Sequence, residues 1–82
     1  MTNINISKLI ESCDLLSQRC ARIADTHHGS SWLFDKLMRT FESSSACTSV
    51  TIPVFINAPV MSKGEATVGR DGSLSMRTVK AE

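Results

Sequence analysis

The sequence predicts an α+β domain: an N-terminal helical hairpin of two amphipathic helices, followed by an antiparallel sheet of two or three strands. Its 82 residues are enough for one domain. Apolar residues recur at helical spacing in the first half of the chain and alternate with polar residues in the second half, as they do in strands. The composition, 41% hydrophobic and 21% charged, is typical of a globular protein.

The first helix is predicted over residues 7–27. Ser7 is a suitable N-cap, and Gly29 can adopt the positive φ that ends a helix. Ile10 and Leu15 flank a seam whose members are spaced alternately by three and four residues: Ile6, Leu9, Cys13, Leu16, Cys20, Ile23 and His27. Such a seam lies along one face of a helix. We expect it to pack on the second helix or on another copy of the chain, as a homodimer.

The second helix is predicted over residues 31–43. Its apolar residues are Trp32, Leu33, Phe34, Leu37, Met38 and Phe41. A short link through Gly29 would fold this helix back on the first one, which gives the helical hairpin.

A first strand is predicted over residues 50–57. Val50, Ile52, Val54 and Ile56 alternate with other residues, and the segment is rich in β-branched side chains. Proline lacks the N–H that a ladder needs, so Pro53 and Pro59 place this strand at the edge of the sheet.

The last two strands, residues 65–69 and 73–79, are predicted to form a hairpin. A three-residue loop, Arg70–Gly72, puts Gly72 in the left-handed conformation of a G1 bulge. Its register pairs four apolar side chains on one face, Val68 with Leu74 and Ala66 with Met76. A two-residue loop would shift the register by one and pair apolar with polar residues. The apolar match therefore favours the three-residue loop.

No recognisable catalytic or cofactor site is present in the sequence. Cys13 and Cys20 are a heptad apart, about 10 Å along a helix, which is too far for one zinc ion. His27, His28 and Cys47 are the alternative metal ligands, but they lack the usual spacing. Because three cysteines suggest no disulfide framework, we expect reduced thiols and a cytoplasmic protein. Because no catalytic or ligand motif is present, we expect no enzymatic activity, metal or cofactor.

Charge and hydropathy argue against two kinds of partner. The formal net charge is +1, so we expect no general affinity for nucleic acid. No stretch approaches the roughly 20 apolar residues of a membrane span, and residues 1–7 do not resemble a signal peptide. We therefore expect no membrane association.

What remains is binding to a protein partner. The sequence predicts a small interaction module that inhibits or adapts its partner, a role that suits a phage- or mobile-element-type accessory protein. Trp32 and Leu33 lie off the centre of their helical stripe, and tryptophan is enriched at interface hot spots. The predicted contact residues are Trp32, Leu33, Phe41 and Phe55. The alternative is a nucleic-acid-binding regulator that uses the basic C-terminal hairpin, through Arg70, Arg77 and Lys80.

Overall fold

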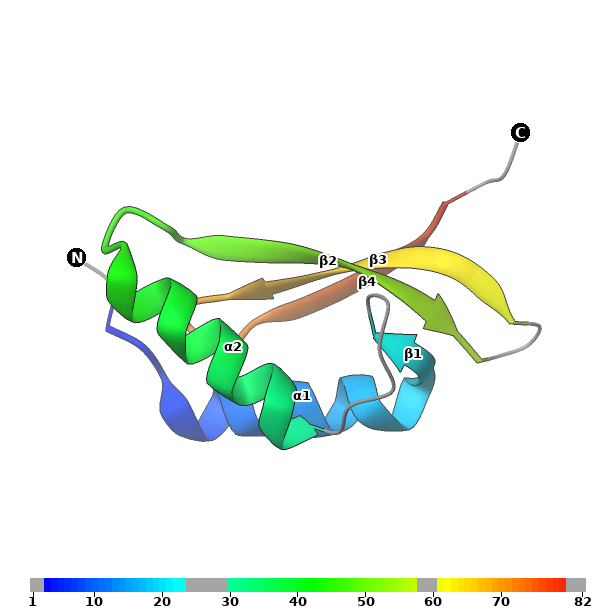
Figure 1. Ribbon diagram of the computed structural model, residues 1–82, viewed down its shortest axis with the longest axis horizontal. Helices are drawn as coiled ribbons and strands as arrows, with labels where there is room; N and C mark the ends of the chain where they lie inside the picture. Colours follow the sequence, from blue (N-terminus) through cyan, green and yellow to red (C-terminus); the bar gives the residue numbers. More distant parts are fainter. Residues whose placement is uncertain (1–2, 24–29, 58–60, 80–82) are drawn as a thin grey trace.

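Two helices lie on one face of a four-stranded antiparallel sheet in the computed structural model, which describes residues 3–23, 30–57 and 61–79 (Figure 1). The elements in chain order are α1 (Ile6–Arg19), β1 (Cys20–Ile23), α2 (Ser30–Ser43), β2 (Ser49–Ile56), β3 (Ser62–Gly69) and β4 (Leu74–Thr78). The strands are arranged in the order β1-β2-β3-β4. The α+β class is confirmed, but the sheet has four strands rather than two or three.

Helix α1 begins and ends earlier than predicted. Its N-cap is Asn5, not Ser7, and the Asn5 side chain accepts a hydrogen bond from the Lys8 N–H at 3.2 Å. The predicted continuation to residue 27 is wrong, because the helix ends at Arg19 and the chain enters β1 directly. Residues 24–27 lie outside the described part of the chain.

A β-bulge explains why a helical pattern continues through β1. Cys20 and Ile23 are both buried, as the predicted helical face requires, although three residues separate them. In a regular strand that spacing would point them to opposite faces. The register shift between Cys20 and Arg22 adds one residue and returns Ile23 to the inner face, opposite Val54.

The predicted helical hairpin is not confirmed, because β1 lies between the two helices in the chain. The helices do contact each other and run in opposite directions beneath the sheet (Figure 1). Helix α2 begins one residue before its predicted start and ends where predicted. Gly29, the expected link, lies outside the described residues.

Strand β2 is central, so its predicted place at the edge of the sheet is wrong. It pairs with β1 on one side and with β3 on the other. Within the described residues β1 reaches only Val54 to Ile56, so Pro53 lies next to β3 alone. The missing N–H of Pro53 therefore interrupts no described pairing with β1.

The predicted β3–β4 register is confirmed. Val68 pairs with Leu74, Ala66 with Met76, and Glu65 with Arg77. The Gly69 N–H donates to the Ser73 carbonyl at 2.8 Å, and Gly72 has the expected positive φ, 89°. The hydroxyl of Ser12 donates to the Gly72 carbonyl and so ties this turn to α1.

The hydrophobic core lies between the helices and the inner face of the sheet. Its buried members are Leu9, Cys13, Leu16, Cys20, Ile23, Leu33, Leu37, Phe41, Ile52, Val54, Ala66 and Val68. Within residues 3–23, 30–57 and 61–79, no helix covers the other face of the sheet (Figure 1). Two surfaces thus remain for binding, the outward side of the helix pair and the outer face of the sheet.

Candidate functional site

The buried thiols are poorly suited to nucleophilic chemistry. Burial, with a smaller contribution from the charge of Asp14, raises the pKa of Cys13 to about 11. Burial also raises the pKa of Cys20. Cys47 is half-buried, and its thiol donates to the Ser49 carbonyl at 3.4 Å. A thiolate is the reactive species, so both buried cysteines act as small apolar groups.

Within residues 3–23, 30–57 and 61–79, no group of three or more histidine, cysteine or acidic residues lies close enough to hold a metal ion. His27 and His28, the predicted alternative ligands, lie outside these ranges. In the same ranges no helix is long and apolar enough to cross a bilayer.

The predicted protein-contact residues lie in three different environments. Leu33 and Phe41 are core residues, with 0% and 1% of their surface exposed, and neither is accessible to a partner. Trp32 is half-buried at the edge of the core, with the Lys36 Nζ 5.5 Å from its ring centroid. Phe55 lies on the outer face of the sheet. The structure does not bring the four together into one surface.

The predicted nucleic-acid residues are also separated. Arg70 is only 7% exposed. Its guanidinium donates to the Phe41 carbonyl in the last turn of α2 and to the carbonyls of Ser44 and Cys47, which follow the helix. Arg77 is exposed and pairs with Glu65. Lys80 lies outside the described residues. Arg70 therefore does not present its charge at the surface of the hairpin, and nucleic-acid binding through Arg77 and Lys80 stays a prediction.

An exposed apolar strip runs along the contact between the two helices. We call it the helical seam and define it as Ile6 and Ile10 of α1 with Phe34 and Met38 of α2. Ile6 is 50% exposed and Ile10 44%, whereas Phe34 and Met38 are half-buried against the core. A groove of about 250 Å³, mostly apolar, lies here and is lined by Ile10, Cys13, Asp14, Ser31 and Phe34.

The antiparallel course of the helices is fixed at Arg70. Its carbonyl accepts from the Asn5 N–H at 3.2 Å, and its guanidinium binds the last carbonyls of α2. The start of α1 and the end of α2 therefore lie together. Ile6, one turn before Ile10 on α1, and Met38, one turn after Phe34 on α2, therefore lie toward the same end of the helix pair.

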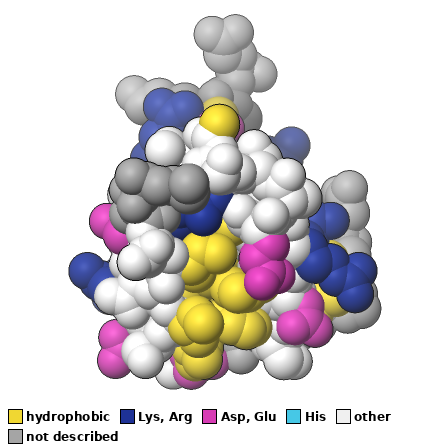
Figure 2. All heavy atoms as spheres, turned by 90° about the vertical axis from the view of Figure 1, so that its left-hand side faces the viewer, with side chains coloured by type: hydrophobic (Ala, Val, Ile, Leu, Met, Phe, Trp, Pro, Cys, Tyr) yellow, Lys and Arg dark blue, Asp and Glu magenta, His cyan; other side chains and the backbone are white. Residues whose placement is uncertain are grey.

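Each helix carries the same short pattern along the helical seam. Two apolar residues and one acid follow at intervals of four: Ile6, Ile10 and Asp14 on α1, then Phe34, Met38 and Glu42 on α2. Such residues share one helical face. Because the helices are antiparallel, Asp14 and Glu42 lie at opposite ends of the seam. Figure 2 views the molecule from the end where α1 begins and α2 ends. It shows hydrophobic side chains there, with acidic side chains on both sides of them.

Basic side chains of the two helices lie away from the helical seam. Lys8 packs against Gly72 in the β3–β4 turn. Lys36 lies over the Trp32 ring, and Arg39 lines the same shallow pocket on the far side of α2. The seam is therefore an apolar surface with one exposed acid at each end, and the buried guanidinium of Arg70 lies at the end where α1 begins and α2 ends.

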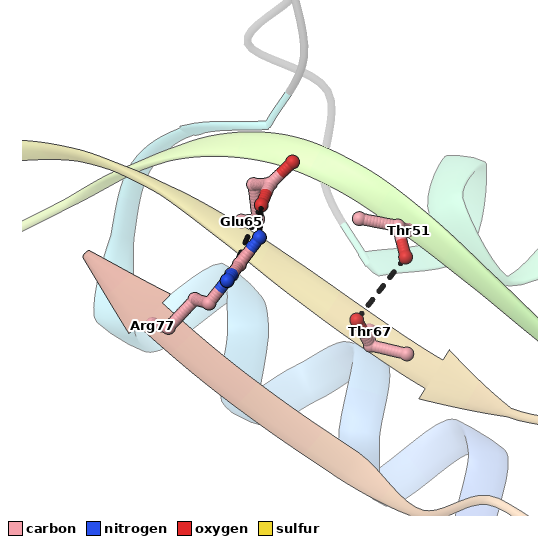
Figure 3. Close-up of polar contacts among 4 residues, drawn as sticks. All are labelled: Thr51, Glu65, Thr67 and Arg77. Atoms are coloured by element: carbon pink, nitrogen blue, oxygen red, sulfur yellow. Dashed lines mark hydrogen bonds and ion pairs between the residues drawn. The ribbon is translucent and has the colours of Figure 1, made fainter. Parts of the chain in front are cut away.

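The outer face of the sheet carries polar and charged side chains. The Thr51 and Thr67 hydroxyls are 3.2 Å apart, and the Arg77 Nε lies 3.0 Å from the Glu65 carboxylate (Figure 3). The register also places Phe55 between Arg22 and Lys63 on neighbouring strands, with the Arg22 Cζ 5.7 Å from the ring centroid. We call the three residues Arg22, Phe55 and Lys63 the sheet row.

Sequence reasoning did not identify the sheet row. Its members come from β1, β2 and β3, and no spacing along the chain links them. Only the pairing of a strand that was predicted as helix brings Arg22 beside Phe55.

Comparisons with protein-family models, with curated proteins and with solved structures gave no match.

Proposed function

We propose that this chain is a non-enzymatic protein-binding module that docks its partner at the helical seam. The observation that carries the proposal is the exposure of Ile6 and Ile10 beside a mostly apolar groove. Covering apolar surface is favourable by about 25 cal/mol per Å². Adjacent exposed apolar residues are typical of interaction sites, whereas single ones are ordinary.

This surface suits a protein that acts by occupying its partner. An inhibitor or adaptor needs a complementary surface and no reacting group. The contact residues are then Ile6 and Ile10, which are exposed, and not the predicted Leu33 and Phe41, which are buried. A second copy of the chain, joined through Ile6 and Ile10 of α1, is the alternative occupant.

Site-directed photo-crosslinking in cells tests where the partner docks. A benzophenone amino acid replaces Ser31, which lines the groove, or Ser75, an exposed residue on β4. We expect a protein adduct from position 31, and its loss when Ile10→Glu is added. The exposed position of Ile10 lets this variant fold, which circular dichroism checks. An adduct only from position 75, or one that Ile10→Glu leaves unchanged, would overturn the proposal.

A second candidate function is binding of single-stranded nucleic acid on the sheet row. Phe55 offers a ring for base stacking, and Arg22 and Lys63 offer charges for phosphates. Fluorescence anisotropy with a labelled oligothymidine at low and moderate salt tests it. We expect binding that weakens with salt and with Phe55→Ala or Lys63→Ala, but not with Ile10→Glu. Absence of binding at low salt would remove this candidate.

A further inference from the structure

We infer that the partner of the helical seam is an amphipathic helix with a lysine or arginine at each end of its apolar stripe. This inference rests on the proposed function and adds the chemistry of the partner. It follows from three features of the seam: its shape, its length and the position of its acids.

The shape favours a helix. The groove lies where two antiparallel helices meet, and the apolar residues on each side recur every four positions. A helix whose own apolar residues recur every three or four positions can place them between such ridges. Docking would place a third helix on the outward side of the helix pair and bury Ile6 and Ile10.

The length limits the segment to a few turns. Ile6 and Asp14 are eight residues apart, about 12 Å along the axis of α1. Glu42 lies one turn beyond Met38, at the other end of the seam. A partner helix of three to four turns reaches both acids, so its basic residues belong near its two ends.

The charges select a basic partner over a second copy of this chain. Asp14 and Glu42 are exposed, and neither forms an ion pair within the described residues, where Arg77–Glu65 is the pair present. Two seams facing each other would bring acid against acid at both ends. Like charges across an interface suppress association, whereas opposite charges promote it and set the orientation.

Designed peptides test the inference on the intact chain. Three 16-residue helical peptides share one leucine stripe and differ only in four end residues, which are lysine, glutamine or glutamate. Fluorescence anisotropy gives affinities, and amide NMR shifts locate the site. We expect the lysine peptide to bind at the helical seam. The glutamate peptide should bind at least about twofold more weakly, which is the smallest effect that the loss of two exposed ion pairs gives.

Matched variants of the chain test the two acids. Asp14→Asn with Glu42→Gln should weaken the lysine peptide by about twofold to thirtyfold and leave the glutamine peptide unchanged. Glu11→Gln, a change of the same kind on α1 but outside the seam pattern, should change neither affinity. The lysine peptide should also lose affinity as salt is raised.

The outcomes separate this inference from the proposed function. Equal affinity for the lysine and glutamate peptides, or no binding of any peptide, would overturn the basic-helix partner. The crosslink from position 31 could still stand and would keep the protein-binding function. A concentration-dependent dimer that Ile10→Glu abolishes, with no peptide bound, would assign the seam to a second copy. If Ile10→Glu leaves the crosslink intact, both proposals fail.

Discussion

The guanidinium of Arg70 lies 5.5 Å from the centroid of the Phe41 ring and donates through Nη2 to the Phe41 carbonyl at 2.5 Å. The same nitrogen donates to the Ser44 carbonyl, and Nε donates to that of Cys47. The last carbonyls of a helix have no partner within the helix, and its C-terminal end attracts positive charge. Arg70 satisfies both requirements from the β3–β4 turn.

Removing the Arg70 guanidinium should therefore destabilise the fold. We expect Arg70→Met to lower the free energy of unfolding by about 1–3 kcal/mol, because it leaves the buried Phe41 carbonyl and the part-buried carbonyls of Ser44 and Cys47 without this donor. Urea denaturation followed by circular dichroism measures the change. Arg77→Met, which breaks the exposed pair with Glu65, is the control and should cost at most about 1 kcal/mol. Equal losses would show that Arg70 is not a structural cap.

Leu33 and Ile10 distinguish core from surface on the helix pair. Leu33→Ala opens a cavity in the core and should cost about 2–5 kcal/mol. Ile10→Ala removes a side chain that is 44% exposed and should cost less than about 1.5 kcal/mol. Thermal and urea unfolding of both variants check the order. A smaller loss for Leu33→Ala than for Ile10→Ala would contradict the packing of α2.

Gly72 should not tolerate a side chain. Its φ of 89° is in the left-handed region, and a Cβ there would lie 2.5 Å from the Lys8 Cβ. We expect Gly72→Ala to destabilise the chain by more than about 1 kcal/mol, through both backbone strain and this contact. Ser75→Ala, at an exposed residue of β4, is the control in the same urea titration. Wild-type stability for Gly72→Ala would exclude the tight approach of α1 to this turn.

Local rules explain which parts of the fold could be predicted. The β3–β4 register depends on one turn and on the apolar residues beside it, so the sequence near Gly72 is sufficient. The end of α1 depends on a distant strand. Cys20 and Ile23 are buried in either conformation, and the bulge lets a strand satisfy the spacing of a helix. Hydrophobic periodicity alone cannot separate the two.

The candidate site was less predictable, for a related reason. Helical periodicity assigned α2 a broad apolar face, but the choice between core and surface depends on where α1 and the sheet lie. That packing buries Leu33 and leaves Met38 half-exposed. The sequence alone predicts Arg70 as an exposed cation in a loop, because its carbonyl partners at Phe41 and Ser44 are far away along the chain. Long-range contacts, not composition, set these roles.

The Cys13 thiol should make the fold less stable in alkaline solution. Its pKa is raised from 9.0 to about 11, chiefly by burial, so the unfolded chain loses this proton at lower pH than the folded chain does. The contribution is complete below pH 9 and is lost as the pH rises through about 11. At 1.36 kcal/mol per pH unit, it amounts to at most about 2–3 kcal/mol.

Urea titrations between pH 8 and pH 11 measure this loss. Cys13→Ala removes the titrating group, so its free energy of unfolding should fall less steeply with pH than that of the wild-type chain, although it starts lower because of the cavity. Leu33→Ala, which opens a cavity in the core without removing a titrating group, should keep the wild-type slope. Parallel curves for wild-type and Cys13→Ala would mean that water reaches the Cys13 sulfur. The groove between Ile10 and Phe34, which Cys13 lines, would then be deeper than the packing of the helices indicates.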